Sequence, residues 1–442
     1  MTIRMDEGAA ELLDTLHRAG YAAYVVGGCV RDSLLGLTPH DWDLCTSALP
    51  QQGMELFGEE KCIPTGLQHG TVTVKQGGGL YEITTFRTEG TYTDGRHPDE
   101  VHFVPDVRED LARRDFTINA MAYNAKEGLV DPFGGQADLQ SGILRAVGVP
   151  HRRFTEDALR ILRLYRFAAR FGFAIDPPTA QAAQELCAHL DCVSVERIEE
   201  ELAKLLSAPA PAAYLDEKIL GVVLPELSPE ALAAAKPVVD ACPAGEQALP
   251  VRLAALLLSL GEDGTRRTLR RLRCSNACIE ETAVLVREVV SGVPGAFSSD
   301  TNRAIPSPAL LPAATGSHPS GRSSEKLPAR PPVSLNIYTR KLLGQYGLKT
   351  VQRLAALGTA LQPEHAADFA ALSELAERLD ADGVCCRISQ LAVNGRDLMA
   401  AGVPAGPGIR KVLEALLDGV IREEYPNERQ ALLAAVQQLA AS

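Results

Sequence analysis

The stretch from residue 24 to residue 46, YVVGGCVRDSLLGLTPHDWDLCT, constrains the fold of this chain more than any other part of it. An apolar run ending at Val26 predicts a short strand, which breaks at Gly27 and Gly28 and leads into a helical turn that carries Arg31. Because glycine has no side chain, backbone N–H groups in such a turn can approach an anion closely. The guanidinium fork of Arg31 matches phosphate oxygens. The pattern therefore predicts a phosphate-binding turn between a strand and a helix.

Two aspartates, Asp41 and Asp43, follow this turn on a second predicted strand. Residues i and i+2 of a strand share a face, so the two carboxylates are expected to point together. Adjacent carboxylates repel unless a cation or a proton lies between them, and Mg²⁺ is commonly held by one or two carboxylates plus substrate phosphates. Either Asp-x-Asp or Gly-Gly alone is common in solvated turns, but in this order and spacing they favour phosphoryl or nucleotidyl transfer.

Further strands and helices are predicted downstream. Residues 61–88 alternate like strands and, with the two earlier strands, predict a small mixed or antiparallel sheet. Glu82 falls on one of these strands, either as a solvent-facing glutamate or, if its strand lies beside the aspartates, as a third metal carboxylate. After residue 150 Ala and Leu dominate, which favours helices. Residues 291–335 are rich in Ser, Pro, Gly and Ala and are interpreted as a disordered or loosely packed insertion.

The net charge and the cysteines limit which partners and which cellular compartment can be expected. The formal net charge is −12, so any contact with nucleic acid is expected to be confined to local clusters of arginine. The N-terminal 20 residues read as an amphipathic helix rather than a secretory signal, and no apolar run is long enough for a membrane span. Ten cysteines without zinc-like spacing indicate a reducing, cytoplasmic location. The arginine clusters are Arg145, Arg152, Arg153, Arg160, Arg163, Arg166 and Arg170, and then Arg266, Arg267, Arg270, Arg271 and Arg273.

The segment 154–173, FTEDALRILRLYRFAARFGF, predicts one helix with Thr155 as its N-cap. Asp157, Arg160, Arg163 and Arg166 recur every three residues along it. Salt bridges three residues apart on the surface are the simplest explanation, but three arginines against one acid exceed what that explanation requires. Upstream, Arg113, Arg114, Asp115 and Asn119 are either a surface ion pair or, beside a phosphate site, ligands of a triphosphate and a ribose.

In this order the motifs resemble those of class II tRNA nucleotidyltransferases, the bacterial-type CCA-adding enzymes, which are relatives of bacterial poly(A) polymerases. The resemblance is specific over residues 20–172 and returns near the C-terminus. The resembling motifs are Gly27-Gly28-x-Val30-Arg31-Asp32, Asp41-x-Asp43, Arg113-Arg114-Asp115-Phe116-Thr117-Ile118-Asn119-Ala120, Asp131-Pro132-Phe133-Gly134-Gly135, Glu156-Asp157-x-Leu159-Arg160-x-x-Arg163, Asn394-Gly395-x-Asp397-Leu398 and Gly406-Pro407-Gly408.

The resemblance implies an α+β fold: a polymerase-β-like nucleotidyltransferase head with a small mixed sheet, followed by an all-helical neck, body and tail. The implied boundaries are 1–145 for the catalytic head, 146–206 for the neck that recognises the nucleobase, 207–337 for the body that contains the insertion, and 338–442 for the tail that binds tRNA. The implied reaction adds C, C and A to the 3′ end of tRNA without a nucleic-acid template, using CTP and ATP and releasing pyrophosphate.

Site roles follow from the same resemblance. Asp41 and Asp43 are implied to bind two Mg²⁺ ions, with Glu82 as a candidate third catalytic carboxylate. Asp157 and Arg160 are implied to read the base, and their chemistry agrees: an acceptor beside a donor complements the amine and ring nitrogen of both C and A, while G and U present the reverse pattern. The implied nucleotide-binding residues are Gly27, Gly28, Arg31, Arg114, Asp115, Asn119, Asp157, Arg160, Arg163 and Arg166.

The subtype has alternatives: a poly(A) polymerase, or an enzyme that adds only CC or only A. Residues 64–74 look like those of the CCA-adding branch. The loop at 88–106, which includes Tyr92, Asp94, Gly95 and Arg96, resembles the full-length loop of enzymes that retain A-addition. The sequence makes no prediction about the oligomeric state.

Overall fold

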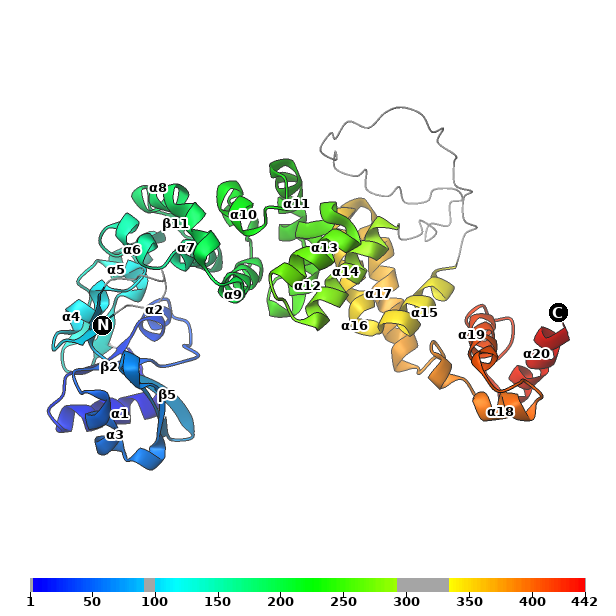
Figure 1. Ribbon diagram of the computed structural model, residues 1–442, viewed down its shortest axis with the longest axis horizontal. Coiled ribbons are helices and arrows are strands. Elements are labelled where there is room, and N and C mark those ends of the chain that lie inside the picture. The colour runs from blue at the N-terminus through cyan, green and yellow to red at the C-terminus, as the bar shows by residue number, and fades with distance from the viewer. Residues whose placement is uncertain (1–2, 91–99, 292–333, 442) are drawn as a thin grey trace. The chain divides into compact units, whose positions relative to one another are not determined.

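The computed structural model describes residues 3–90, 100–291 and 334–441. The chain divides into two compact units, Met1–Pro225 and Glu226–Ser442 (Figure 1). The loop residues Tyr92, Asp94, Gly95 and Arg96 and nearly all of the insertion predicted at 291–335 lie outside the described residues. No helix among the described residues is long and apolar enough to cross a membrane.

A seven-stranded mixed sheet forms the centre of the first unit, as the sequence predicts. Neighbouring strands are antiparallel except for β2 and β5, which run parallel. The strand order across the sheet is β3 (Cys62–Gly66), β4 (Thr71–Gln76), β5 (Gly79–Thr85), β2 (Leu44–Thr46), β1 (Ala23–Val26), β8 (Ala122–Asn124) and β9 (Gly128–Val130).

Five helices and a short hairpin accompany this sheet. The amphipathic N-terminal helix α1 is confirmed, with Asp6 accepting hydrogen bonds from the N–H groups of Gly8 and Ala9 as its N-cap. The helices are α1 (Glu7–Arg18), α2 (Gly28–Leu34), α3 (Pro50–Phe57), α4 (Val107–Ala112) and α5 (Gly135–Ser141), and the hairpin pairs β6 (Arg87–Glu89) with β7 (Val101–Phe103).

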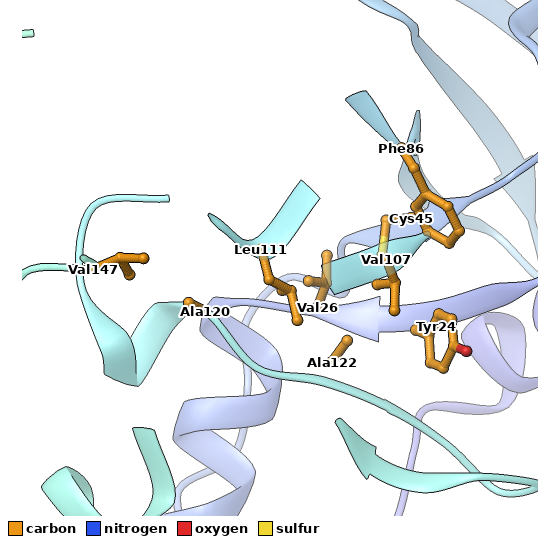
Figure 2. Packing of buried hydrophobic residues seen from close by; sticks show 9 residues of the cluster. All are labelled: Tyr24, Val26, Cys45, Phe86, Val107, Leu111, Ala120, Ala122 and Val147. Atoms are coloured by element: carbon orange, nitrogen blue, oxygen red, sulfur yellow. The ribbon is translucent and has the colours of Figure 1, made fainter. Parts of the chain in front are cut away.

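One apolar core fixes the end of β1, where the predicted site begins. Figure 2 shows Val107 and Leu111 of α4 directed toward Tyr24 and Val26 of β1, with Phe86 completing the cluster. Leu111 and Phe86 have no exposed surface, so this packing contributes about 1.5–3 kcal/mol for each large side chain. Because α4 is held against β1, the residues that follow each element, 113–115 and 27–28, are brought together.

The segment that follows the sheet is helical and contains a break that the sequence analysis missed. We predicted one helix over 154–173, but α6 (Pro150–Glu156) ends before Asp157, whose backbone is extended, and α7 (Leu159–Phe171) starts anew. Thr155 therefore lies inside α6 and is not an N-cap; instead Asp157 Oδ1 accepts a hydrogen bond from the Leu159 N–H at 3.1 Å. The helix α7 ends at Gly172, which has a φ of +68°.

Three further helices complete the first unit, and α9 packs along α7 (Figure 1). The helices are α8 (Pro177–Leu186), α9 (Val195–Leu206) and α10 (Glu217–Val223), and a two-stranded parallel ladder joins β10 (Ile143–Leu144) to β11 (Ala174–Ile175).

The second unit is helical throughout its described residues. Its C-terminal helices share an apolar core that includes Leu398, Leu416 and Leu432. The elements are α11 (Pro229–Ala241), α12 (Leu249–Leu257), α13 (Gly261–Arg271), α14 (Asn276–Val290), α15 (Leu335–Tyr346), α16 (Leu348–Leu361), α17 (Ala366–Ala381), α18 (Gly395–Ala400), α19 (Pro407–Ile421) and α20 (Arg429–Ala441).

Candidate active site

The turn after β1 requires glycine and holds an arginine against it. Gly27 has φ of +77°, a conformation that L side chains rarely adopt, and its N–H donates to the Met121 carbonyl at 3.0 Å. A Cβ on Gly27 would lie 2.7 Å from Nη1 of Arg114. The bare backbone of the turn therefore lets this guanidinium lie directly beside it.

Arg31, on the helix that follows the turn, is almost completely buried, with 4% of its surface exposed. Its Nη1 donates to Asn119 Oδ1 at 2.5 Å and its Nε donates to Asp32 Oδ1 at 2.7 Å. Its guanidinium carbon lies 5.2 Å from the ring centre of Phe167 and 4.9 Å from that of Phe171. These contacts fix Arg31 between α2, residue 119 and α7.

Asp41 and Asp43 precede β2, which begins at Leu44, so the predicted second strand starts after the carboxylates rather than around them. Since β1 turns away at Gly27, the residues before Asp43 have no partner strand. Pairing begins at Asp43, whose carbonyl accepts from the Val26 N–H at 2.9 Å. The strand β5 lies beside β2, in a parallel register that puts Glu82 next to Asp43.

Asp43 is an exposed residue that lines a cleft. Partial loss of hydration raises the pKa of Asp43, and the negative charges of Glu82 and Asp41 raise it further against the opposing charge of Arg114. Such a cluster is relieved by a cation, and carboxylate oxygens are ligands that Mg²⁺ prefers. No group of three or more His, Cys, Asp or Glu arranged to hold a metal occurs among the described residues, so a third-ligand role for Glu82 stays a prediction.

The two adjacent arginines after α4 are anchored by one buried acid. Arg113 Nη2 lies 2.9 Å from Asp110 Oδ1, and its Nη1 lies 2.9 Å from Glu89 Oε1. Arg114 Nη2 lies 3.5 Å from Asp110 Oδ2. Burial alone would raise the pKa of Asp110, but the two arginines hold it below its ordinary value. Both guanidinium groups line the cleft.

Asp115 connects this segment to α7. Its Oδ1 accepts from the Phe116 N–H at 2.8 Å and from Asn119 Nδ2 at 3.0 Å, and its Oδ2 accepts from Arg163 Nη2 at 2.6 Å and Nε at 2.9 Å. Burial works to raise the pKa of Asp115, but Arg163 and Asn119 outweigh it and hold the pKa well below its usual range. The carboxylate is therefore a fixed negative charge inside the cleft.

Asp157 and Arg160 line the same cleft. Arg160 Nη1 donates to Glu156 Oε2 at 2.8 Å and to the Arg153 carbonyl at 3.2 Å, and its Nη2 donates to the Arg113 carbonyl at 3.1 Å. Asp157 does not pair with Arg160. The break between α6 and α7 turns its carboxylate toward a different helix, where it meets Arg197.

Arg166, another predicted nucleotide ligand, lies behind the cleft instead of lining it. Its Nε is 2.6 Å from Glu201 Oε2, and its guanidinium carbon is 3.8 Å from the ring centre of Phe167. Burial lowers the pKa of Arg166 to about 10, against the opposing charge of Glu201. Arg160, Arg163 and Arg166 pair with acids of the first unit, so a role of these three arginines in binding RNA stays a prediction.

The cleft has a volume of about 410 Å³ and collects most of the predicted residues. Asp41, Glu82 and Arg166 do not line it. The sequence did not single out Phe167 and Arg197. It offered Arg113 as a possible triphosphate ligand because of its position beside Arg114, but the resemblance did not include Arg113 among the nucleotide-binding residues. The lining residues are Gly27, Gly28, Arg31, Asp43, Arg113, Arg114, Asp115, Asn119, Asp157, Arg160, Arg163, Phe167 and Arg197.

Three family models match separate parts of the chain. Residues 23–145 match the poly A polymerase head domain, residues 172–230 a probable RNA and SrmB-binding site of polymerase A, and residues 337–436 a putative tRNA nucleotidyltransferase domain 2. The first of these contains the turn, the carboxylates and the arginine pair described above.

Whole-length relatives agree with these models. The CCA-adding enzyme of Lactiplantibacillus plantarum is 35% identical over 97% of this chain and 95% of its own length. The crystal structure of the Bacillus stearothermophilus CCA-adding enzyme in complex with CTP matches with a TM-score of 0.77 at 30% identity, over 99% of this chain and 98% of that one. The fold also matches the Thermotoga maritima CCA-adding enzyme complexed with tRNA, with a TM-score of 0.63 at 20% identity over 99% and 97% of the two chains. This chain therefore belongs to the family of CCA-adding enzymes.

Proposed function

We propose that this protein adds C, C and A to the 3′ end of tRNA from CTP and ATP, releasing pyrophosphate at each step. The observation that carries the proposal is one cleft that joins three parts: the carboxylate Asp43, the cations around the glycine turn, and the acid–base pair Asp157 and Arg160. A nucleoside triphosphate needs these three environments in this order, for its reacting phosphorus, its phosphates and its base. The relative crystallised with CTP supports the same function.

In the proposed reaction Asp41 and Asp43 hold Mg²⁺ together with the triphosphate, and the raised pKa of Asp43 fits a site that a cation completes. The metal supplies charge neutralisation of the leaving pyrophosphate and activation of the tRNA 3′-hydroxyl. Arg114 binds the triphosphate beside the backbone of Gly27 and Gly28.

Asp115 is proposed to accept a hydrogen bond from the ribose, since its low pKa keeps it ionised throughout the physiological range. Arg163 and Asn119 hold its carboxylate in place. Arg31 supports this arrangement through Asn119 and is proposed to present its remaining donors to phosphate oxygens.

Base selection is assigned to Asp157 and Arg160. The carboxylate accepts from the exocyclic amine of C or A, and the guanidinium donates to the adjacent ring nitrogen. The contacts of Arg160 with Glu156 and two carbonyl groups leave donors of its fork available among the described contacts. U and G would place a carbonyl oxygen against the carboxylate of Asp157 and a ring N–H against the guanidinium of Arg160. A desolvated site rejects both mismatches strongly.

The test is incorporation of CTP and ATP into a tRNA that ends at its discriminator base. Product sequencing should show C, C and A and then termination. A long A tail would indicate a poly(A) polymerase, and products ending in CC, or extension only of a tRNA that already carries CC, would indicate partial addition. Absence of any incorporation in the presence of Mg²⁺ would overturn the proposal.

The proposal includes the four-part division into head, neck, body and tail at 145, 206 and 337, with the tail binding tRNA. It also includes a cytoplasmic location. The ten cysteines show no zinc-like spacing, which fits a reducing compartment.

A further inference from the structure

Arg197, which lies on another helix, binds the Asp157 carboxylate that is proposed to select the base. Arg197 Nη1 donates to Asp157 Oδ1 at 3.2 Å, and Nη2 donates to Oδ2 at 2.8 Å. This is the two-point geometry that an arginine fork makes with a carboxylate. The side chains of Asp157 and Arg197 are only 15% and 22% exposed, and both residues line the cleft.

The hydrogen bonds of Asp157 leave it with one acceptor site. A carboxylate offers about four lone-pair directions, two on each oxygen. Oδ1 accepts from the Leu159 N–H and from Arg197 Nη1, while Oδ2 accepts from Arg197 Nη2. Among the described contacts, the remaining direction belongs to Oδ2. One open acceptor is what a single exocyclic amine requires.

The helix that carries Arg197 is itself well anchored. Ile198, Leu202 and Leu205 of α9 are buried, and α9 packs along α7. One turn after Arg197, Glu201 pairs with Arg166 of α7. The packed pair of helices therefore fixes the position of Arg197. Through its ion pair, Arg197 in turn fixes Asp157, which lies between α6 and α7.

We infer that Arg197 is a positioning residue for nucleotide selection: it fixes the plane of the Asp157 carboxylate so that one Oδ2 acceptor faces the amine of C or A. The inference rests on the proposed function and assigns a specificity-determining role to a residue that has no contact with the reacting phosphate. Without Arg197, Asp157 can rotate, so it accepts less well from an amine and no longer opposes the carbonyl oxygen of uracil.

The test compares wild-type protein with Arg197→Met, which keeps the length of the side chain and removes its donors. Values of kcat/KM are measured for CTP, for UTP and for the triphosphate of the cytidine analogue that lacks the 4-amino group. We expect the CTP-to-UTP ratio to fall at least about tenfold, and the loss with CTP to exceed the loss with the analogue. Equal losses with all three nucleotides would overturn the inference, because a general structural defect lowers them together.

Two further variants keep the test decisive if Arg197→Met folds poorly. Arg197→Lys keeps the charge without the planar fork and should show a smaller fall in the same ratio. Lys204→Met, on the solvent side of the same helix where Lys204 pairs with Glu200, should match wild type in all three rates. An unchanged CTP-to-UTP ratio in Arg197→Lys would count against the inference.

A double variant tests whether Arg197 affects nucleotide selection through Asp157. If Arg197 acts through Asp157, Asp157→Ala combined with Arg197→Met should have the selectivity of Asp157→Ala alone. Additive losses of selectivity would contradict the inference. Failure of the proposed function itself gives a different result, since wild-type protein would then not extend tRNA with C and A.

Discussion

Asp115 and Arg163 form a two-point ion pair across 48 residues of sequence, with Oδ2 of the aspartate 2.6 Å from Nη2 and 2.9 Å from Nε of the arginine. The pair joins the segment after α4 to α7, so it ties the sheet-bearing part of the first unit to the helices that carry Asp157. The same carboxylate is proposed to contact the ribose. One ion pair therefore affects both stability and the geometry of the cleft.

The first prediction concerns pH. The folded pKa of Asp115 lies below that of an unfolded aspartate, which is about 3.9. Above that pH neither state binds the proton; as the pH falls below about 3.9 the unfolded chain takes it up first, and the free energy of unfolding decreases. In Asp115→Asn this contribution is missing, so the urea midpoint should fall less steeply between about pH 5 and pH 3 than in wild type.

At neutral pH the same variant should lose about 1–3 kcal/mol of stability, because Arg163 loses its charged acceptor. Asp191→Asn is the matched control, since Asp191 is exposed, and it should follow wild type at every pH. Identical acid slopes for Asp115→Asn and wild type would show that Asp115 does not contribute in this way.

The second prediction concerns the metal. Because the pKa of Asp43 is raised, its ionised form is disfavoured in the folded state, and without divalent cations Asp43→Asn should unfold at a slightly higher temperature than wild type. Mg²⁺ should raise the Tm of wild type, by the equivalent of about 2.7 kcal/mol at 100 times its Kd. It should leave the Tm of Asp43→Asn nearly unchanged.

Nucleotide addition by Asp43→Asn should fall at least about 100-fold, since charge stabilisation at the reacting phosphate is lost. Glu55→Gln, an exposed position on α3, controls for a general loss of negative charge and should respond to Mg²⁺ like wild type. A full Mg²⁺-dependent shift in Asp43→Asn would remove Asp43 from the metal site.

Local sequence predicted the surroundings of Asp43 better than those of Asp157. The glycine turn, Asp41 and Asp43 lie close together in sequence, and strand periodicity with turn chemistry was enough to predict their proximity. The mixed sheet was also predicted correctly. The start of β2 was misplaced because pairing depends on where β1 stops, and that is decided by the positive φ of Gly27.

The surroundings of Asp157 depend on tertiary contacts. The apolar spacing over 154–173 is continuous, so it gave no sign that two helices meet at Asp157. This junction turns the carboxylate of Asp157 away from Arg160. Arg197 lies 40 residues from its partner on a helix whose pattern is simply amphipathic. Only the packing of α9 on α7 brings these two residues together, and spacing alone does not reveal it.

The third prediction concerns selectivity. Asp157→Ala removes the acceptor for the exocyclic amine, so the ratio of CTP to UTP incorporation should fall by about 10–100-fold. The Mg²⁺-dependent rise in Tm should remain, because Asp157 is not among the residues proposed to hold the metal. Discrimination against UTP and GTP at the wild-type level would exclude Asp157 as the residue that reads the base.

The fourth prediction separates backbone strain from the approach of Arg114 to the glycine turn. Gly27→Ala forces an L residue to φ of +77° and places a Cβ 2.7 Å from Arg114 Nη1. The strain should lower stability by about 1–2 kcal/mol. Displacement of the Arg114 guanidinium should also lower kcat/KM for both CTP and ATP by about 10–100-fold.

Gly128 provides a closely matched control, since it has the same φ of +77° and a Cβ added there would meet nothing within 4 Å. Gly128→Ala should lose a similar amount of stability, measured by urea denaturation, and keep wild-type kinetics. If both variants lose stability and neither loses activity, Arg114 does not depend on the bare backbone of Gly27. If both lose activity equally, strain in the sheet explains the effect, and the close approach at the turn does not contribute to nucleotide binding.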